Sequence, residues 1–292
     1  MGSRVDQPSV SIIIPAYNEA AALEDLLPKV RALMADAEII VVDDCSDDPP
    51  IDLCQRHNIR LIRHPRNLGN GAAVKTGARR ARGEVLVFMD GDGQHDPEDI
   101  PRLLVKLEQG FDMVVGARSR ASQANIGRGL ANRIYNKLAS LIVGHPIPDL
   151  TSGFRAARAA LFKDFIYLLP NGFSYPTTST MAFFRSGYPV GYLPITAAKR
   201  NGKSHIRPIR DGARFLLIIF KVGTLYSPLK VFAPAGLFFF LIGWGYYLYT
   251  FMAMHRFTNM SALLIVTGIL IFLMGLISEQ VTALTYNAEK RQ

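Results

Sequence analysis

Two long stretches of this 292-residue chain lack charge: residues 231–255 and residues 257–278 contain no Asp, Glu, Lys or Arg. At about 1.5 Å of rise per helical residue, each stretch can cross a hydrocarbon layer about 30 Å thick. Residues 237–242 and 263–276 are apolar around the whole helix, which argues against two helices buried in a soluble core. We therefore expect two transmembrane helices that form a hairpin around residues 256–260.

Cysteine is also scarce, because only Cys45 and Cys54 occur and their spacing is not that of a metal site. We expect both to be free thiols in a reducing compartment. A signal peptide is not expected either, since the first apolar cluster, residues 10–14, is short and typical of a strand.

Basic residues are unevenly distributed around the expected hairpin. Lys221 and Lys230 precede it and Lys290 and Arg291 follow it, whereas the connecting turn carries Arg256 alone. The positive-inside rule then places both termini, and the domain before the hairpin, in the cytoplasm. We expect a multi-pass protein of the cell (cytoplasmic) membrane.

The net charge of +9 suits an anionic lipid bilayer or phosphorylated substrates. Nucleic acid is not an expected partner, because basic residues do not alternate with aromatic ones and no nucleic-acid-binding motif occurs. Internal repeats and low-complexity segments are absent as well.

Residues 10 to about 115 alternate between short apolar stretches and helical periodicity. Strands are expected at residues 10–14, 38–42, 59–62, 85–89 and 113–115, and helices at residues 20–34, 67–82 and 97–108. Such alternation predicts an α/β fold with a mainly parallel sheet covered by helices on both faces. Ligands of such sheets bind beyond the carboxyl ends of the strands, at the loops of residues 15–19, 43–48, 67–71 and 90–95.

Residues 116–210 are less regular and rich in Arg and Lys. We expect helices at residues 124–143 and 178–186, a loop at 149–155 and a strand at 190–195. Residues 209–226 carry an apolar stripe beside a basic one, which indicates an amphipathic helix in the membrane interface; a helix packed on the soluble domain is the alternative. The expected parts are a domain at 1–208, a juxtamembrane helix at 209–228, and a hairpin with a short tail at 229–292.

The chemistry is expected at residues 85–99, where an apolar strand ends at two carboxylates. Asp90 and Asp92 lie two residues apart, so in extended backbone they face the same way, and Gly91 allows a ligand to approach closely. Together with Gln94 they form an oxygen donor set that suits Mg²⁺ or Mn²⁺ shared with substrate phosphates. The alternative is an ordinary acidic turn between a strand and a helix.

Four motifs occur in the order that inverting family-2 glycosyltransferases with the GT-A fold show, and the chain resembles that family. The motifs are Pro15, Ala16, Tyr17, Asn18, Glu19; Val42, Asp43, Asp44, Cys45, Ser46; Asp90, Gly91, Asp92, Gly93, Gln94, His95; and Asp149, Leu150, Thr151, Ser152, Gly153, Phe154, Arg155. The last motif, followed by a membrane hairpin, is similar to polyprenyl-phosphate glycosyltransferases, including dolichyl-phosphate mannose synthases and undecaprenyl-phosphate glucosyltransferases. The resemblance covers residues 10 to about 230.

This resemblance implies a nucleotide-sugar donor. Pro15, Tyr17 and Glu19 are then expected to line the nucleoside pocket. Asp44, with Asp43 behind it, is expected to accept hydrogen bonds from the base or the ribose, because no competing positive charge is expected nearby.

The resemblance also implies a divalent metal, Mg²⁺ or Mn²⁺, that bridges the diphosphate of the donor. Asp92, which counts as catalytic, and Gln94 are its expected ligands, and Asp90 reaches either the metal or the donor. Gly91 belongs to the donor site and stands where many relatives carry Ala or another residue. We expect it to loosen the turn slightly. Residues 67–75 are expected to start a helix near the donor rather than a P-loop, because no Gly-Lys-Ser/Thr follows.

A polyprenyl phosphate acceptor presents a dianion, which guanidinium groups match well. The resemblance assigns Arg118 and Arg128 to the acceptor phosphate, and Arg155, at the end of the Asp149 motif, to catalysis. Three further candidates for the acceptor phosphate precede the expected interfacial helix: Lys203, His205 and Arg207. Each of these basic side chains is alternatively a solvated surface charge.

Asp149 stands where the catalytic aspartate of the family is sought; alternatively, it orients Arg155 or the acceptor loop. A phosphate monoester with a second pKa near 6 is already mostly dianionic at pH 7, so a strong base is unnecessary. Attack of its oxygen on the anomeric carbon inverts the configuration.

We therefore expect an enzyme that transfers one hexose from GDP-mannose or UDP-glucose to a polyprenyl phosphate on the cytoplasmic face. Two alternatives stay open: the same donor site with a hydroxyl acceptor on a lipid or lipid-linked saccharide, and a catalytically silent module that binds nucleotide sugars. Processive polymer synthesis is not expected, because the only Trp, Trp244, lies in a membrane run and the Gln-x-x-Arg-Trp motif is absent. Small residues in the hairpin leave a homo-oligomer open: Gly236, Gly243, Gly245 and Gly268.

Overall fold

The computed structural model describes residues 9–118, 126–172, 174–196 and 227–289, with residues 217, 220, 223 and 224 in addition. For residues 126–132 and 285–289 it describes the backbone alone. The chain divides into two compact units. One unit comprises Met1–Lys137 and His145–Gly212, and the other comprises Leu138–Gly144 and Ala213–Gln292.

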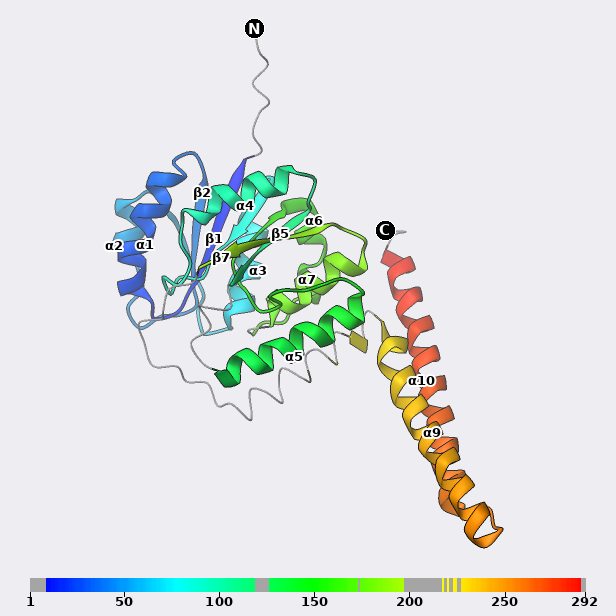
Figure 1. The fold of residues 1–292 in the computed structure, drawn as a ribbon. Coiled ribbons are helices and arrows are strands. Elements are labelled where there is room, and N and C mark those ends of the chain that lie inside the picture. The colour runs from blue at the N-terminus through cyan, green and yellow to red at the C-terminus, as the bar shows by residue number, and fades with distance from the viewer. Residues whose placement is uncertain are drawn as a thin grey trace. The chain divides into compact units, whose positions relative to one another are not determined.

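The first unit is built on a seven-stranded sheet with the order β3-β2-β1-β4-β6-β5-β7 (Figure 1). Its strands are β1 Val10–Ala16, β2 Glu38–Asp43, β3 Arg60–Arg63, β4 Val85–Phe88, β5 Met113–Arg118, β6 Arg155–Arg158 and β7 Val190–Ile195. Only β6 runs antiparallel to its neighbours, β4 and β5. The other pairs are parallel, which confirms the predicted α/β fold with a mainly parallel sheet.

The helices of this unit are α1 Ala20–Leu33, α2 Ile51–Arg56, α3 Asn70–Arg80, α4 Asp99–Glu108, α6 Ala159–Asp164 and α7 Tyr175–Arg185, and α5 Ile126–Val143 runs from the first unit into the second. Five of them fall where helical periodicity predicts them. The short elements α2, α6 and β6 were not predicted, and β6 begins inside the expected loop at its last residue, Arg155. Its sequence, Arg-Ala-Ala-Arg, carries no β-branched or aromatic residue, so pairing with β4 and β5 determines its conformation.

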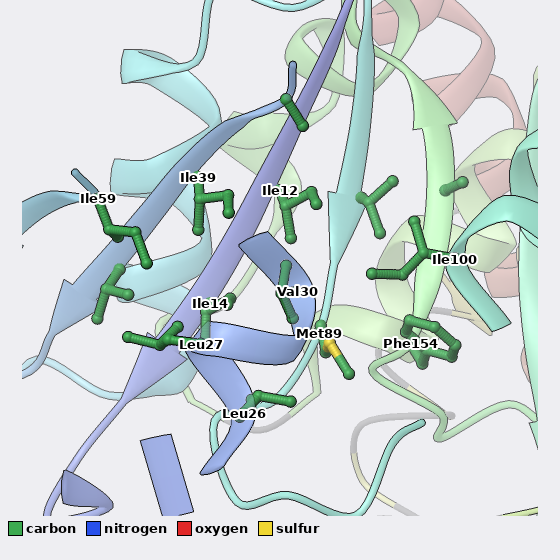
Figure 2. Packing of buried hydrophobic residues seen from close by; sticks show 14 of the residues in the cluster. Ile12, Ile14, Leu26, Leu27, Val30, Ile39, Ile59, Met89, Ile100 and Phe154 are labelled. Atoms are coloured by element: carbon green, nitrogen blue, oxygen red, sulfur yellow. The ribbon is translucent and has the colours of Figure 1, made fainter. Parts of the chain in front are cut away.

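The two faces of the sheet pack against different helices. Ile12 and Ile14 of β1 point toward α1 and α4 and belong to the hydrophobic cluster drawn in Figure 2. Ile13, between them, faces the other way and packs on α3, where a Cβ on Gly77 would lie 2.4 Å from its Cγ2 atom. Alternating strand residues therefore serve two cores, as expected for a sheet with helices on both faces.

The carboxyl edge of the sheet collects the loops that carry the predicted motifs. Because β1, β2 and β4 are parallel, the residues that follow Ala16, Asp43 and Phe88 lie along one edge. The antiparallel β6 begins at that edge, which brings residues 149–154 to it, and β5 ends there at Arg118. All four motifs therefore meet beyond the same ends of the strands.

The second unit contains two long apolar helices, α9 Pro228–Met254 and α10 Asn259–Glu289, which form a hairpin (Figure 1). Residues Pro228–Met254 and Asn259–Leu284 are each long and apolar enough to cross a membrane, and most of their side chains are exposed. The expected amphipathic helix at 209–226 lies mostly outside the described residues.

Small residues bring α9 and α10 into close contact. A Cβ on Gly236 would lie 2.8 Å from the Gly268 carbonyl oxygen, and a Cβ on Gly268 would lie 2.7 Å from the Gly236 carbonyl oxygen. Gly243 is equally crowded by the Ile265 backbone, at 2.8 Å. Only Gly245 of the four predicted small residues has nothing within 4 Å. Three of the four glycines thus serve the hairpin itself, which removes them as evidence for an oligomer.

A Gly268→Val substitution is expected to open the hairpin, because the side chain would overlap the Gly236 backbone. Overpacking of this kind costs about 1–3 kcal/mol. Gly245→Val is the matched control, since that position has free space. Thermal unfolding in detergent should show a lower melting temperature for Gly268→Val alone; equal melting temperatures of the two variants would contradict the packing.

Candidate functional site

The acidic stretch after β4 forms the centre of the site. Asp90, Asp92 and Gln94 are half-buried, and the backbone amide of Gln94 donates to Asp92 Oδ1 over 3.2 Å. His95 is buried and stacks on Phe154, with ring centroids 5.0 Å apart. The acidic stretch is therefore packed directly against the 149–154 segment.

Gly91 fills a tight position rather than loosening the turn, contrary to the expectation from sequence. Its amide donates to the Pro15 carbonyl oxygen over 3.3 Å, and a Cβ would lie 3.1 Å from that oxygen. Pro15 lies inside β1 and is buried, so its carbonyl, more than its ring, shapes the site. Alanine fits at Gly91 only if these neighbours shift by a few tenths of an ångström.

Gly153 lies directly against the Asp90 carboxylate. A Cβ at Gly153 would lie 2.5 Å from Asp90 Oδ2, closer than real Cβ atoms approach an oxygen. This contact between two motifs about 60 residues apart was not predicted. The glycine in the Asp149 motif was its only sequence signal, because glycine permits such close approach.

Arg118 and Asp149 form a bidentate ion pair beside the carboxylates. Arg118 donates from Nε to Asp149 Oδ2 over 2.8 Å and from Nη2 to Asp149 Oδ1 over 3.0 Å. Nη2 also donates to Thr151 Oγ1 over 2.6 Å. Asp149 therefore orients Arg118 rather than Arg155, which corrects one of the two roles considered from sequence.

The electrostatics show that this pair is charged and close to the acidic stretch. Burial alone raises the pKa of Asp149, but the hydrogen bonds and charge of Arg118 and the amide of Thr151 hold it below its ordinary value. Burial alone lowers the pKa of Arg118, but Asp149, and more weakly Asp90 and Asp92, raise it above its ordinary value. A guanidinium thus lies within electrostatic reach of both carboxylates that follow β4.

Arg155, predicted to be catalytic, is fully buried. Its Nη2 donates to the Ser152 carbonyl oxygen, and its Nη1 donates to the Pro176 carbonyl oxygen and the Ser179 hydroxyl. The reason is its position in β6: alternate residues of that strand face the core beneath α7. All of these acceptors belong to the protein itself, two backbone carbonyls and a hydroxyl, so in this structure the guanidinium holds the fold together.

The first two motifs are tied to each other by Asn18. Its backbone amide donates to Ser46 Oγ over 2.8 Å, and its side-chain amide donates to Asp47 Oδ2 over 3.2 Å. Tyr17, the next residue back, is 48% exposed and Glu19 is half-buried. Both residues follow the carboxyl end of β1, and their place in a nucleoside pocket stays a prediction.

Asp43 and Asp44 have positively charged or polar partners, which corrects the expectation that none lie near. Asp43 Oδ2 is 3.2 Å from Arg63 Nε, and Asp44 Oδ1 is 2.7 Å from His64 Nδ1. The parallel pairing of β2 with β3 sets Asp43 opposite Arg63, a long-range fact that the local sequence does not contain. Both carboxylates are buried.

Asp44 also holds the loop that precedes α3. Its Oδ1 accepts from the Leu68 amide over 2.9 Å and its Oδ2 accepts from the Gly69 amide over 2.7 Å. In this structure Asp44 therefore organises residues 68 and 69, directly before α3.

The N-terminus of α3 is a helix start and not a phosphate cradle. The amides of Gly71 and Ala72 donate to the carbonyl oxygens of Gly172 and Asn171, over 3.2 and 3.0 Å. Those N–H groups are the ones that a P-loop would offer to phosphate. This bears out the prediction made from the missing Gly-Lys-Ser/Thr.

Several predicted residues lie outside what the structure describes. The backbone of Arg128 belongs to α5, but its side chain is among those not described, and Lys203, His205 and Arg207 are not described at all. Both cysteines are free, as predicted, and burial, together with the nearby charge of Asp43, raises the pKa of Cys54 to about 11.

The residues at the strand end fit a divalent metal. Asp90, Asp92 and Gln94 supply hard oxygen donors, which Mg²⁺ and Mn²⁺ prefer. Within the described part of the chain, no three His, Cys, Asp or Glu side chains gather into a complete metal cage. Such a donor set suits an ion whose other ligands come from a bound diphosphate.

Comparison with known families decides the class of the protein. Residues 11–166, more than half of the chain, match the family described as glycosyl transferase family 2. This chain belongs to glycosyl transferase family 2. Residues 227–284 match the family described as GtrB C-terminal hairpin, which covers α9 and most of α10. The family resemblance seen in the four motifs is thereby confirmed.

Two curated relatives of this family 2 glycosyltransferase extend over most of its length. Glycosyltransferase AglJ of Haloferax volcanii is 27% identical over 248 residues, which are 82% of this chain and 80% of the relative. Undecaprenyl-phosphate 4-deoxy-4-formamido-L-arabinose transferase of Pseudomonas fluorescens is 31% identical over 252 residues, which are 78% and 70% of the two chains.

Among solved structures, glucosyl-3-phosphoglycerate synthase of Mycobacterium tuberculosis, in complex with Mn²⁺, UDP and glucosyl-3-phosphoglycerate, shares the fold. Its TM-score is 0.57 at 20% identity, and the match covers 74% of this chain and 78% of that one. The match confirms the GT-A-like architecture of the first unit.

Proposed function

We propose that this glycosyltransferase moves one hexose from a nucleotide sugar, GDP-mannose or UDP-glucose, to a polyprenyl phosphate. The transfer inverts the anomeric configuration and takes place on the cytoplasmic face of the membrane that the hairpin spans. The product is a lipid-phosphate sugar. The name of the Pseudomonas fluorescens relative, an undecaprenyl-phosphate sugar transferase, supports the acceptor class.

The observation that carries the proposal is the position of Arg118. Its guanidinium lies within electrostatic reach of Asp90 and Asp92, the expected ligands of the metal ion, and Asp149 and Thr151 fix its plane. Its Nη1 has no hydrogen-bond partner among the described residues, and its side chain is 28% exposed. A fixed, partly exposed guanidinium is well suited to a phosphate oxygen.

Asp90, Asp92 and Gln94 would hold a Mg²⁺ or Mn²⁺ ion, which would stabilise the negative charge of the leaving nucleoside diphosphate. Tyr17 and Glu19 line the nucleoside pocket. Arg118 orients the acceptor so that one phosphate oxygen faces the anomeric carbon. A bond from that oxygen to the carbon forms while the bond from the carbon to the diphosphate breaks, which inverts the configuration.

A hydroxyl acceptor is the rival that shares this donor site, and the state of Asp149 speaks against it. A hydroxyl nucleophile needs a base to take its proton, and the base works best with a pKa near the operating pH. Arg118 holds the pKa of Asp149 below its ordinary value and occupies both carboxylate oxygens. Asp149 is therefore a poor base and a good orienting group for Arg118.

The pH dependence separates these two mechanisms. Folding lowers the pKa of Asp149, so this carboxylate stabilises the fold fully at pH values above its unfolded pKa of about 3.9. That stabilisation is lost only as the pH falls further, through the pKa of the folded state. The titration of Asp149 therefore does not destabilise the fold near pH 6. We expect kcat/KM for the acceptor to fall below about pH 6, where the phosphate takes up its second proton. Asp149→Asn should show the same fall in kcat/KM at the same pH. A variant in which this fall disappears would favour the hydroxyl mechanism.

A direct test is transfer of radiolabelled sugar by the full chain in detergent. GDP-mannose and UDP-glucose are offered in parallel, with undecaprenyl or dolichyl phosphate and with Mg²⁺, Mn²⁺ or a chelator. Labelled lipid formed from one donor, in the presence of metal only, is the expected result. Folded protein that yields no labelled lipid from either donor would contradict the proposal.

A further inference from the structure

Two buried side chains hold the backbone of the 149–154 segment from beneath. Arg155 Nη2 donates to the carbonyl oxygen of Ser152, and Tyr175 Oη donates to the carbonyl oxygen of Gly153 over 3.1 Å. The Arg155 guanidinium also lies 5.7 Å from the centre of the Tyr175 ring. Consecutive carbonyl groups of one loop are thus held by two neighbouring side chains.

The same arginine binds the first turns of α7. Nη1 of Arg155 donates to the Pro176 carbonyl oxygen over 3.0 Å, to Ser179 Oγ over 2.7 Å and to Thr180 Oγ1 over 3.1 Å. Tyr175 is itself the first residue of α7. Arg155 and Tyr175 therefore join the loop to a helix that is anchored in the core.

A charge in this place is costly for the fold. Arg155 is fully buried, and within the described residues no carboxylate lies at ion-pair distance from it. Burial lowers the pKa of Arg155, while the charges of Asp149 and Asp90 act against this at longer range. An apolar side chain would pack a core at lower cost, so the guanidinium is explained better by the carbonyl groups that it holds.

The loop that is held touches both halves of the site. Gly153 lies against Asp90, where a Cβ would lie 2.5 Å from Oδ2, and Asp149 of the same loop binds Arg118. Any movement of the loop would change the spacing between the Asp90 carboxylate and the Arg118 guanidinium.

We propose that Arg155 and Tyr175 are positioning residues that hold residues 149–154 against Asp90 and so fix the distance between the metal-binding carboxylates and the acceptor-binding arginine. This inference rests on the proposed function. It gives Arg155, which cannot reach a substrate, a role in setting the reacting geometry. Misplacement of reacting groups by about 1 Å can cost up to 100-fold in rate.

The sharpest variant is Tyr175→Phe, which removes the hydroxyl that donates to Gly153 and keeps the buried ring. Its matched control is Tyr188→Phe, since the Tyr188 ring packs on Phe165 and Phe183 and its hydroxyl has no partner among the described residues. We expect kcat to fall about tenfold in Tyr175→Phe and to stay unchanged in Tyr188→Phe, with KM for the donor changing less than about twofold. A merely structural role would lower the folded fraction but not kcat per folded molecule.

A second pair tests the contact with Asp90 without measuring activity. Gly153→Ala should push the Asp90 carboxylate away, whereas Gly172→Ala is a control with nothing within 4 Å of the added Cβ. The readout is the thermal shift produced by MnCl₂ titrated in the presence of GDP or UDP. We expect Gly153→Ala and Tyr175→Phe to need several-fold more Mn²⁺ for the same shift than Gly172→Ala.

The outcomes are distinct. Wild-type Mn²⁺ response and wild-type kcat in Tyr175→Phe would overturn the positioning role, whatever the lipid acceptor. A wild-type protein that transfers no sugar would refute the proposed function. The Mn²⁺ titrations would still test whether Arg155 and Tyr175 hold residues 149–154 in place. If Tyr175→Phe melts much lower, Arg155→Lys, which keeps the charge and a donor nitrogen, should retain part of the kcat that Arg155→Met loses.

Discussion

Sugar transfer is expected to fall by about 10²–10³-fold when Asp92 is replaced by asparagine. The variant loses one of the two carboxylates that we propose as ligands of the metal ion, and that ion would stabilise the leaving diphosphate. Asparagine keeps the shape and the acceptor oxygen for the Gln94 amide, so the fold should not change. The measurement is kcat at saturating donor over a range of Mn²⁺ concentrations, with thermal unfolding as the check on structure.

Glu98→Gln is the matched control for this variant. Glu98 is an exposed carboxylate of the same acidic stretch, and its side chain does not cap α4. We expect wild-type rates from it. Wild-type transfer rates in both Asp92→Asn and Glu98→Gln would mean that the acidic stretch is an ordinary turn that takes no part in the transfer.

The second large effect is expected at Arg118. Arg118→Met leaves the buried Asp149 carboxylate without its partner, and breaking a buried pair in this way costs about 3–5 kcal/mol. The same change removes the group that we assign to the acceptor phosphate. Thermal unfolding and the KM for polyprenyl phosphate should therefore both change in this one variant.

A double variant separates the two losses. Arg118→Met combined with Asp149→Asn removes the unpaired charge, so we expect most of the stability to return. The KM for the acceptor should stay about 10²-fold higher than in the wild type, because a pair of charge-assisted hydrogen bonds is lost. Arg158→Met is the control, because Arg158 pairs with Asp112 where both side chains are partly exposed to solvent, and ion pairs contribute little at such sites. A double variant that is stable and binds acceptor normally would show that Arg118 serves the fold alone.

The centre of the site could be predicted because its signals are local. A run of apolar residues from Val85 to Met89 that stops at Asp90 marks the end of a buried strand, and the parallel sheet places that end beside the ends of β1 and β2. The loops at residues 15–19 and 43–48 follow from the same rule. Local patterning and one topological rule were sufficient there.

The roles of Arg155 and Asp44 could not be predicted, since both depend on pairing between distant segments. Arg155 is buried because β6 inserts between β4 and β5, and the sequence Arg-Ala-Ala-Arg contains no strand signal. Asp44 has a histidine partner because β3 lies beside β2. A motif that resembles a family marks such residues as important, but only the fold shows whether they face a ligand or the core.

The most direct test of the central claim compares two acceptors that differ in one group. The full chain, in detergent with Mn²⁺ and the donor that it accepts, is given undecaprenyl phosphate or undecaprenol at equal concentration, and labelled lipid is measured over time. We predict sugar transfer to the phosphate and none to the alcohol, because in our proposal Arg118 binds the phosphate and Asp149 does not act as a base. Transfer to undecaprenol at a comparable rate would contradict the account.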